Sequence, residues 1–594
     1  MTSRGLFSNN APPGCAGPLN VATKASEVGD HRIKVERSGL WAAYGDALGW
    51  ISELTDARGL ARRTSGEPLR TPIEWGRRIG GRTGVTATLP RGCYSDDSQL
   101  RLATGRAIGP DGFDVEVFAK VELPVWLSYG LGGGRATSTA AEHLAKPNVS
   151  WFANTFKGWA NSGGNGAAMR VQPHIWAAAS PGDADSFLLD VIRNTVCTHS
   201  HPTGLMGSVL HSLALAWTLN SGRSPSPADL SQCVEIAASL PKIIRSDREV
   251  GTYWLGVFER ESGSFNVGWS QAVADARDAI DCAREIPTDG SGAERYGAIV
   301  ERLGLQDPAR RGSGILTAVA ATALTWCEPR PKEALQVAAN AIGTDTDSIA
   351  TMAGAILGIT AESEPPIDVL DAQLFRAEAA RLSEIASGGQ PPSHDYPDLL
   401  HWSPPRTRAD SLAILEDGGL YVRGLGRAEA MSEPIQSPLK QFNWQWLKLA
   451  IGQTLLIKRR RELETASESI AEPSGTSPRG RELLEAHGDL QVSRGSLKAE
   501  DGAPPTRKES TSIEPHRSGT LDGLDLGRAL RYVADRRDDD RIVGKALRKV
   551  VREGSPGEIA GFTAGLIDLM RQTGDPLRTE NLARQSIPDR SKSE

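Results

Sequence analysis

Apolar residues recur at three- and four-residue steps along much of this chain. The pattern is clearest in residues 208–219, 315–326 and 349–357, and strict alternation of apolar and polar residues is scarce. Spacing of three and four places side chains on one face of an α-helix, so the body of the chain is predicted to be helical. This body runs from about residue 37 to residue 385.

Many of the predicted helices are rich in Ala, Gly and Ser, as in residues 312–324. Small side chains let helix backbones approach closely, which suits a compact orthogonal bundle better than a leucine-rich coiled coil. The predicted fold class is therefore all-α, a compact orthogonal helical bundle in residues 37–385 with a C-terminal extension.

The segments that flank this body differ from it in composition. Residues 1–36 are rich in Gly, Pro, Ser and Asn and are predicted to be a flexible leader. Residues 386–461 form a Pro- and Gly-rich extension, in which the apolar stretch 442–457 predicts one helix. Because a basic run follows this stretch, a membrane-surface helix is one interpretation. A core helix with a solvated basic end is the favoured one.

The C-terminal part of the chain is expected to contain a linker and a second ordered unit. Residues 462–520 mix Ser, Pro, Gly, Glu and Arg without apolar periodicity, which predicts a disordered linker. Helical spacing returns in residues 521–594, so we expect a small helical module there. Its function cannot be read from the sequence, but it is a candidate for binding a protein partner.

Bulk composition limits the class of protein. The 594 residues are too many for one compact core, and the hydrophobic content of 39% is ordinary for a soluble protein. The formal net charge of -6 gives no global reason to expect a nucleic-acid partner. No stretch approaches the ~20 apolar residues that a membrane span needs. The cysteines show no Cys-x-x-Cys spacing that would suggest zinc or a redox pair, so they are expected to be reduced thiols. No apolar run follows a basic start, so a cytoplasmic location is expected.

Two acidic clusters carry the clearest chemical signal. They are Ser95-Asp96-Asp97-Ser98 and Asp345-Thr346-Asp347-Ser348, and each opens an apolar segment of helical character. A helix cap explains one acid, but it does not need two carboxylates beside two hydroxyls, and Ser98 stands where a capping box has Glu or Gln. Carboxylates brought together repel one another unless cations lie among them, which favours hard divalent cations.

Three further segments add candidate site residues. Asp46 and Glu53 lie amid small and apolar residues, where a hydrogen-bonding core residue and an exposed helix residue are the plain alternatives. The glycine-dense turn Asn161–Gly166 precedes an apparent helix, and such turns present backbone N–H groups to phosphate. His199 and His201 have no neighbouring Cys or Glu, so hydrogen bonding or stacking is favoured over zinc binding.

Together these segments resemble, in order, the motifs of the ADP-ribosylglycohydrolase family, over about residues 37–385. The matching segments are Gly45-Asp46-Ala47-Leu48-Gly49 with Glu53, Ser95-Asp96-Asp97-Ser98-Gln99, Gly164-Asn165-Gly166-Ala167-Ala168-Met169-Arg170, Thr198-His199-Ser200-His201 and Gly343-Thr344-Asp345-Thr346-Asp347-Ser348-Ile349-Ala350. The chain departs from the family in having Ser at hydroxyl positions that are often Thr, namely 95, 98 and 348. Serine keeps the oxygen, so metal coordination should survive.

The resemblance implies an all-helical fold with two Mg²⁺ or Mn²⁺ ions in a cleft. By motif position, the metal ligands would be Ser95, Asp96, Asp97, Asp345, Asp347 and Ser348. Glu53 and Asp97 are the catalytic candidates, and Glu53 is favoured for proton transfer because ligation lowers the basicity of Asp97. The substrate-binding residues would be Asn161, Ser162, Gly163, Gly164, Asn165, Gly166 and His199.

The implied reaction is hydrolysis of the bond between the ribose anomeric carbon of ADP-ribose and an acceptor, through an oxocarbenium-like transition state. The substrate would be an ADP-ribosylated protein or a small ADP-ribose conjugate, and the acceptor group stays open. Two alternatives also stay open. One is a hydrolase of a small ADP-ribose ester or nucleotide conjugate, and the other is a non-catalytic ADP-ribose-binding protein.

Overall fold

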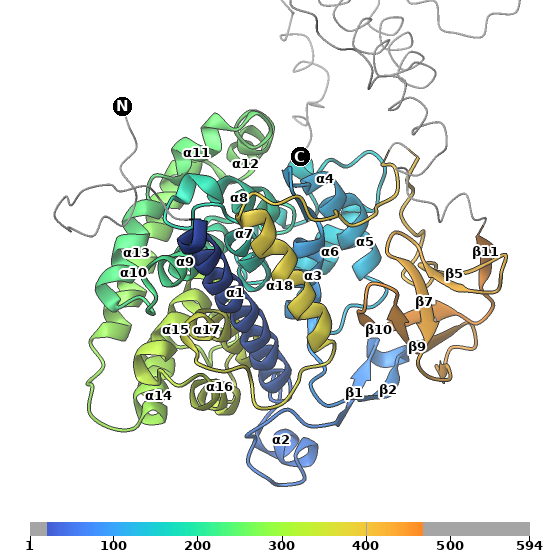
Figure 1. The fold of residues 1–594 in the computed structure, drawn as a ribbon, viewed down its shortest axis with the longest axis horizontal. Coiled ribbons are helices and arrows are strands. Elements are labelled where there is room, and N and C mark those ends of the chain that lie inside the picture. The colour runs from blue at the N-terminus through green and yellow to red at the C-terminus, as the bar shows by residue number, and fades with distance from the viewer. Residues whose placement is uncertain (1–20, 400, 467–594) are drawn as a thin grey trace, which may run out of the picture. The chain divides into compact units, whose positions relative to one another are not determined.

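The computed structural model describes residues 21–399 and 401–466 (Figure 1). Its first element is helix α1 (Val21–Gly49), so the predicted leader, residues 1–36, is wrong for residues 21–36. Tertiary contacts explain the difference, since His31 Nδ1 lies 2.9 Å from the Ser383 hydroxyl and Val35 is buried. Residues 1–20 lie outside the described residues, as do residues 467–594.

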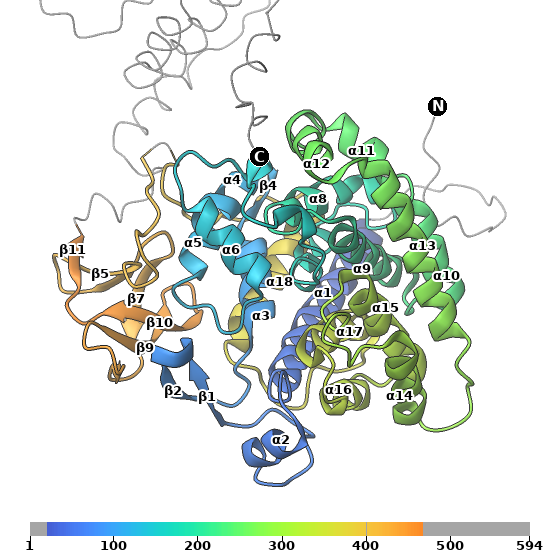
Figure 2. The same cartoon turned by 180° about the vertical axis from the view of Figure 1, so that it is seen from behind.

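The predicted all-α body is confirmed. The apolar segments at 208–219, 315–326 and 349–357 lie in α9 (Pro202–Ser221), α15 (Gly314–Cys327) and α17 (Thr346–Thr360), which are buried around almost their whole circumference and form the centre of the body (Figure 2). Its helices are α1, α2 (Ala57–Arg63), α3 (Asp96–Arg106), α4 (Val115–Val117), α5 (Leu123–Trp126), α6 (Arg135–Leu144), α7 (Gln172–Trp176), α8 (Leu188–Val196), α9 (Pro202–Ser221), α10 (Pro227–Ala237), α11 (Leu240–Ser246), α12 (Leu255–Ser262), α13 (Phe265–Arg284), α14 (Gly292–Leu303), α15 (Gly314–Cys327), α16 (Pro331–Asn340), α17 (Thr346–Thr360) and α18 (Ala372–Ala386).

Short helical turns connect several of these helices. The 3₁₀ turns are η1 (Gly81–Thr83), η3 (Trp151–Ala153), η4 (Trp159–Asn161), η5 (Ala168–Arg170) and η6 (Ala184–Ser186), and the π-helical turns are η2 (Phe118–Glu122) and η7 (Val250–Trp254). Among the described residues, no helix combines the length and the apolar character needed to cross a membrane.

Helices α1 and α17 run antiparallel at very short range. A Cβ atom on Gly45 would lie 2.4 Å from the carbonyl oxygen of Ala350, and one on Gly49 would lie 2.4 Å from that of Thr346. Gly354 makes the reciprocal approach to the backbone of Trp41. Small residues therefore permit this contact, as the sequence indicated. The contact brings the C-terminal end of α1 beside the N-terminus of α17.

Two small hairpins interrupt the helical body. Strands β1 (Trp75–Ile79) and β2 (Val85–Leu89) are antiparallel, and β3 (Ile108–Gly109) pairs with β4 (Gly112–Phe113). Along β1, Trp75 and Ile79 are buried, Arg77 is half-buried, and Arg78 points to solvent. This alternation directs Arg77 inwards.

The C-terminal extension folds as a sheet, so the predicted helix in 442–457 is wrong. The stretch forms an antiparallel hairpin of β9 and β10, whose turn contains Gly452 at a φ of 97°. Phe442, Trp444 and Trp446 alternate with polar residues, a period-two pattern that fits a strand. The strands are β5 (Leu412–Leu415), β6 (Leu420–Val422), β7 (Gly426–Ala430), β8 (Ile435–Gln436), β9 (Phe442–Leu449), β10 (Thr454–Arg460) and β11 (Glu464–Ala466).

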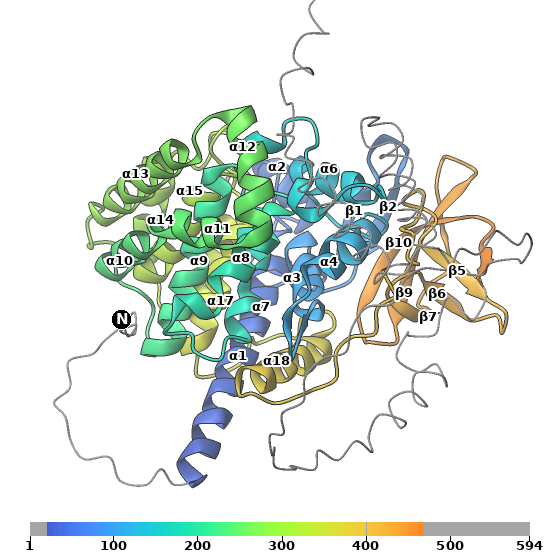
Figure 3. The same cartoon turned by 90° about the horizontal axis from the view of Figure 1, so that it is seen from above.

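The sheet order is β10-β9-β7-β6-β5-β11, with β8 paired to β9. Figure 3 shows this sheet at the side of the helical body. Strand β11 pairs in parallel with β5, so residues 464–466 are ordered although they fall in the predicted linker, residues 462–520. The rest of that linker and the module predicted for residues 521–594 lie outside the described residues. Because no helix is present in 442–457, the membrane-surface interpretation is also wrong.

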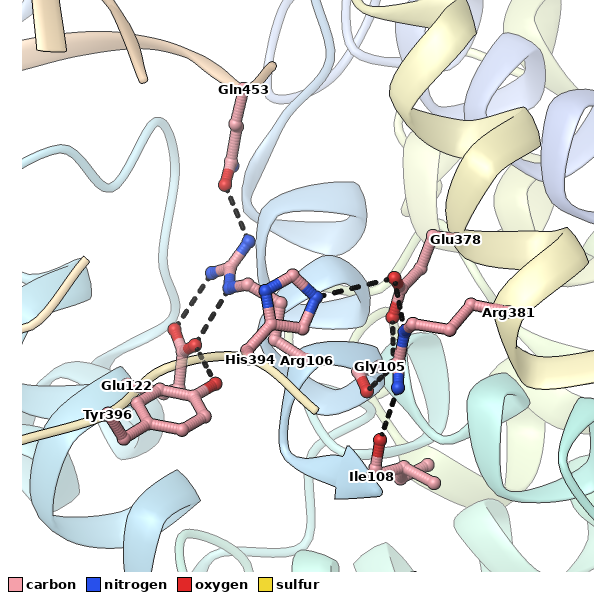
Figure 4. A network of polar contacts seen from close by, with 9 residues as sticks. All are labelled: Gly105, Arg106, Ile108, Glu122, Glu378, Arg381, His394, Tyr396 and Gln453. Carbon is pink, nitrogen blue, oxygen red and sulfur yellow. Dashed lines mark hydrogen bonds and ion pairs between the residues drawn. The ribbon is translucent and has the colours of Figure 1, made fainter. Parts of the chain in front are cut away.

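Buried polar contacts join the sheet to the helical body (Figure 4). Arg106 on α3 forms a fully buried ion pair with Glu122, with Nε 2.8 Å from Oε1. The same guanidinium donates to Oε1 of Gln453 in the sheet at 2.7 Å, and the Tyr396 hydroxyl donates to Glu122 at 2.6 Å. Helix α3 is therefore fixed at its C-terminal end by the extension. Its N-terminal end carries the first acidic cluster.

Candidate active site

A cavity of about 720 Å³ opens in the helical body and collects residues from distant parts of the chain. The turn after α1, the N-termini of α3 and α17, the loop before α6 and the glycine-dense turn all contribute to its wall. The side chains that line the cavity include Glu53, Arg77, Asp96, Asp97, Arg135, Lys157, His199, Asp345, Asp347 and Ser348.

Glu53 stands in the turn that follows α1. The backbone N–H of Glu53 donates to the carbonyl of Gly49 at 3.1 Å, which extends the helical path by one turn. The carboxylate accepts a hydrogen bond from Arg77 Nη2 at 3.2 Å. Burial raises the pKa of Glu53, although the positive charge of Arg77 acts in the opposite direction. The turn thus presents a half-buried, partly neutralised carboxylate to the cavity.

The first acidic cluster is held by a residue of α1. Asp46 is fully buried, and its two carboxylate oxygens accept hydrogen bonds from the backbone N–H groups of Ser95 and Ser98, both at 2.9 Å. The Ser95 hydroxyl caps the same helix by accepting from the Asp97 N–H at 3.2 Å. Asp46 and Ser95 therefore satisfy the N-terminus of α3. This leaves Asp96 and Asp97 free to face the cavity.

The second acidic cluster opens α17 and meets Glu53. Thr346 donates its hydroxyl hydrogen to the Gly49 carbonyl at 2.8 Å, which fixes the start of α17 against α1. Glu53, Asp345 and Asp347 each offer a carboxylate oxygen, and these oxygens lie within 4.8 Å of one another. Such spacing places Glu53 close to any oxygen-liganded cation that the two aspartates would hold.

The electrostatics of the site call for positive charge. Burial raises the pKa of Asp96 to about 7, and burial with neighbouring carboxylates raises the pKa values of Asp97 and Asp347 well above their usual range. Oδ2 of Asp97 is buried without a hydrogen-bond partner among the described residues. An orphaned carboxylate oxygen inside a cluster of acids is a suitable ligand for a hard cation, so these residues fit divalent metal ions.

The glycine-dense turn is tied to the acidic cluster. Asn165 donates through Nδ2 to Asp345 Oδ2 at 2.9 Å, and its backbone N–H donates to the Gly312 carbonyl at 3.0 Å. All six residues from 161 to 166 line the cavity. The turn therefore forms one wall of the cavity, with its position set by α15 and α17.

His199 closes this wall as a neutral imidazole. Its Nδ1 lies 2.8 Å from the Thr198 hydroxyl, and burial with the nearby charge of Arg170 lowers its pKa to about 3. A Cβ atom on Gly166 would lie 2.9 Å from Cε1 of His199, so glycine is required for this contact. A neutral ring in this place can hydrogen-bond or stack but adds no charge to the cavity.

The structure brings nearly all of the predicted site residues into this one cavity. Among the predicted metal ligands, catalytic residues and substrate-binding residues, Ser95 is the exception, because it is fully buried beneath the lining and its hydroxyl is engaged as a cap. Asp46 and His201, the two other candidates, also lie outside the lining. Ser348 does line the cavity, with its hydroxyl 3.9 Å from the Met169 sulfur. Arg77, Arg135 and Lys157 also line the cavity but were not predicted. They carry no sequence signal, since isolated cationic residues look like ordinary surface residues.

Comparison with known proteins agrees with this arrangement. A family profile described as ADP-ribosylglycohydrolase matches residues 37–388. The chain belongs to the ADP-ribosylglycohydrolase family. That family acts on ADP-ribosyl linkages and is typically metal-dependent, and its helical domain coincides with the body described above.

One solved structure that resembles this chain is titled "ADP-ribosylglycohydrolase-related protein complex". It is 18% identical in sequence with a TM-score of 0.40, over 60% of this chain and 99% of that chain. Among curated proteins, no match was found.

Proposed function

We propose that this protein hydrolyses the bond between ADP-ribose and an acceptor, using two Mg²⁺ or Mn²⁺ ions held in the cavity. The observation that carries the proposal is the approach of Glu53, Asp345 and Asp347 to within 4.8 Å, beside the orphaned oxygen of Asp97. Acids gathered so closely in a buried wall need cations. The adjoining glycine-dense turn supports a phosphate-bearing substrate.

The site residues divide into metal ligands, substrate-binding residues and a residue for proton transfer. Asp96, Asp97, Asp345, Asp347 and Ser348 would hold the ions, with the Ser95 hydroxyl serving mainly as the cap of α3. The ions, when bound, would supply Lewis-acid charge for the ribose hydroxyls and the attacking water. Residues 161–166 and His199 would hold the diphosphate and the adjoining ribose.

Glu53 is the group we assign to proton transfer or to positioning at the scissile bond. It lies beside Asp345 and Asp347 but, unlike them, it is paired with an arginine. Such a carboxylate can stay ionised next to the acidic cluster and accept a proton or orient a water. Asp97, the second catalytic candidate, has both a buried position and acidic neighbours, which suits ligation better than free base catalysis.

The alternatives make different demands on the site. A non-catalytic ADP-ribose-binding protein could dispense with one of the acids, but every acid assigned to metal binding or to catalysis is present and lines the cavity. This favours hydrolysis. A hydrolase of a small ADP-ribose ester or nucleotide conjugate would use the same ADP-ribose end, so substrate comparison must separate it from the main proposal.

The test uses the full chain with ADP-ribosylated peptides and a small ADP-ribose ester, with Mg²⁺, with Mn²⁺ and with a chelator. We expect metal-dependent release of ADP-ribose from a peptide. Asp345→Ala should lower kcat/KM by at least about a hundredfold, whereas Asp278→Ala, an exposed acid on α13, should not change it. Full activity with the chelator would contradict the proposal.

A second variant separates chemistry from binding. Glu53→Gln keeps the shape of the side chain but cannot accept a proton, so turnover should fall by about 10²–10⁴-fold. ADP-ribose affinity, measured by calorimetry in the presence of Mg²⁺, should stay within about threefold of the wild type. Unchanged turnover would remove Glu53 from the mechanism.

A further inference from the structure

Arg77 is a cationic residue built into the wall of the cavity beside Glu53. Its Nη2 donates to Glu53 Oε2 at 3.2 Å, and both side chains are less than one-fifth exposed. The guanidinium carbon lies 4.9 Å from the ring centroid of Trp50 and 5.7 Å from that of Trp75. Contacts with two indoles and a carboxylate restrict the guanidinium to one position.

The strand that carries Arg77 is supported by the C-terminal sheet. At the turn between β1 and β2, a Cβ atom on Gly80 would lie 2.5 Å from the Trp444 ring of β9. The Ser437 hydroxyl also donates to the Thr83 carbonyl at 3.0 Å. The β1–β2 hairpin lies next to the sheet in both Figure 1 and Figure 2. The sheet therefore holds the hairpin, and with it Arg77, at the cavity.

Almost every charged group that lines the cavity can be matched with a group of opposite charge. Its described lining contains five carboxylates, four of them in the two acidic clusters and the fifth on Glu53. Two divalent cations would offset the four clustered acids, and Arg77 is bonded to Glu53. The two other cationic residues of the lining, Arg135 and Lys157, suit the negatively charged diphosphate. Among the described residues, no carboxylate of the cavity is left for a cationic acceptor.

We propose that Arg77 selects the acceptor by charge, so that the protein cleaves ADP-ribose from an uncharged hydroxyl acceptor and rejects a guanidinium acceptor. The inference rests on the proposed function and adds the substrate class to it. An acceptor leaving beside Glu53 must pass next to the Arg77 guanidinium. A neutral alcohol meets no repulsion there, whereas an arginine-linked group brings a second positive charge against a fixed one.

The test compares two peptides that carry ADP-ribose, one on serine and one on arginine. The wild-type protein should show a kcat/KM at least about tenfold higher for the serine-linked peptide, since a like-charge contact disfavours binding strongly. Arg77→Gln should reduce this ratio by at least about tenfold through its effect on KM for the arginine-linked peptide. Arg77→Lys, which keeps the charge, should restore most of the ratio.

Arg78→Gln is the matched control. Arg78 is exposed on the same strand and donates to the carbonyls of Gly81 and Arg82, away from the cavity. Its removal should leave the ratio unchanged. If Arg77 only supports the hairpin, Arg77→Gln will lower kcat/KM equally for both peptides. That outcome, or a wild-type preference for the arginine-linked peptide, overturns charge selection.

A binding measurement distinguishes the two possible failures. The wild type and Arg77→Gln should bind ADP-ribose in the presence of Mg²⁺ with dissociation constants within about threefold of each other, because charge selection assigns Arg77 to the acceptor and not to ADP-ribose. If the wild type neither binds ADP-ribose nor cleaves either peptide, the proposed function itself fails, and charge selection falls with it. If binding and cleavage are present but the ratio does not respond to Arg77, only charge selection fails.

Discussion

The carboxylate of Asp46 accepts a hydrogen bond from the backbone N–H of Ser95 at 2.9 Å, across 49 residues of sequence. Asp46 belongs to the last turn of α1, and Ser95 is the N-cap of α3. One buried side chain therefore ties the end of one helix to the start of another. The two acids that follow Ser95 take their positions in the cavity from this bond.

Removal of this bond should weaken both folding and the site. We expect Asp46→Ala to lower the free energy of unfolding by about 2–3 kcal/mol, because two buried N–H groups lose their acceptor. Mg²⁺ affinity should fall by about tenfold or more, as Asp96 and Asp97 lose their support. Asp56→Ala is the control, since Asp56 caps the peripheral helix α2 through the Gly59 N–H at 2.7 Å. It should lower stability by about 1 kcal/mol and leave Mg²⁺ affinity unchanged in titration calorimetry.

Contact between α1 and α17 should tolerate no added side chain. A Cβ atom on Gly49 would lie 2.4 Å from the Thr346 carbonyl oxygen and 2.7 Å from Cα of Asp347. Gly49→Ala should therefore push the second acidic cluster away from Glu53, with a loss of about 1–3 kcal/mol in chemical denaturation. Gly256→Ala, in α12 with no atom within 4 Å of the new methyl, should be neutral or slightly stabilising. Equal effects of the two substitutions would contradict the packing described.

Metal binding should appear as thermal stabilisation. Burial raises the pKa values of Asp97 and Asp347, so the folded protein gains from any cation that offsets their charge. At a Mg²⁺ concentration of about a hundred times Kd, the native state should gain about 2.7 kcal/mol, visible as a rise in melting temperature on adding Mg²⁺ after chelation. Asp97→Asn should remove most of this rise, whereas Asp278→Asn should keep it. A melting temperature that Mg²⁺ does not move would exclude a tight site.

Stability at acid pH should depend on Glu378, shown in Figure 4. Burial alone would raise the pKa of Glu378, but hydrogen bonds from Arg381 and the charges of Arg381 and His394 lower it to about 2. Because the folded pKa is below the unfolded value of about 4.3, this carboxylate contributes stability above pH ~4 that is lost as the pH falls towards 2.

The variant Glu378→Gln should therefore flatten the dependence of unfolding free energy on pH between about 4.5 and 2, by about 2–3 kcal/mol. Exposed Glu384 lies on the same helix, so Glu384→Gln is the control and should retain the slope. A slope that is unchanged in Glu378→Gln would show that other groups govern acid unfolding.

Much of the helical body and of the cavity followed from the sequence. Spacing of three and four in α9, α15 and α17 is unambiguous because these helices are long and apolar. The two acidic clusters could be assigned to one site although they are far apart in sequence. Their carboxylates would repel one another if brought together, unless cations lay between them. The sequence indicated only that Asp46 could form hydrogen bonds within the core. Its hydrogen-bond partners are two backbone N–H groups at the start of α3.

Other features depend on contacts that one segment cannot reveal. The apolar run at 442–457 fits a helix by composition, but its period-two alternation and the pairing between β9 and β10 decide for a strand. Arg77 gains its position from Glu53, Trp50 and the sheet beneath its hairpin, each distant in sequence. The position of His31 in α1 depends likewise on a contact with α18. Tertiary contacts override local composition in each case.

The most direct test of the central claim is the rate of ADP-ribose release from a serine-linked ADP-ribosyl peptide by the full chain, with and without divalent metal. We predict release in Mg²⁺ or Mn²⁺, abolition by a chelator, recovery when metal is restored, and a loss of at least about a hundredfold in Asp345→Ala. Release that persists in the chelator, or an Asp345→Ala variant as active as Asp278→Ala, would contradict the two-ion account.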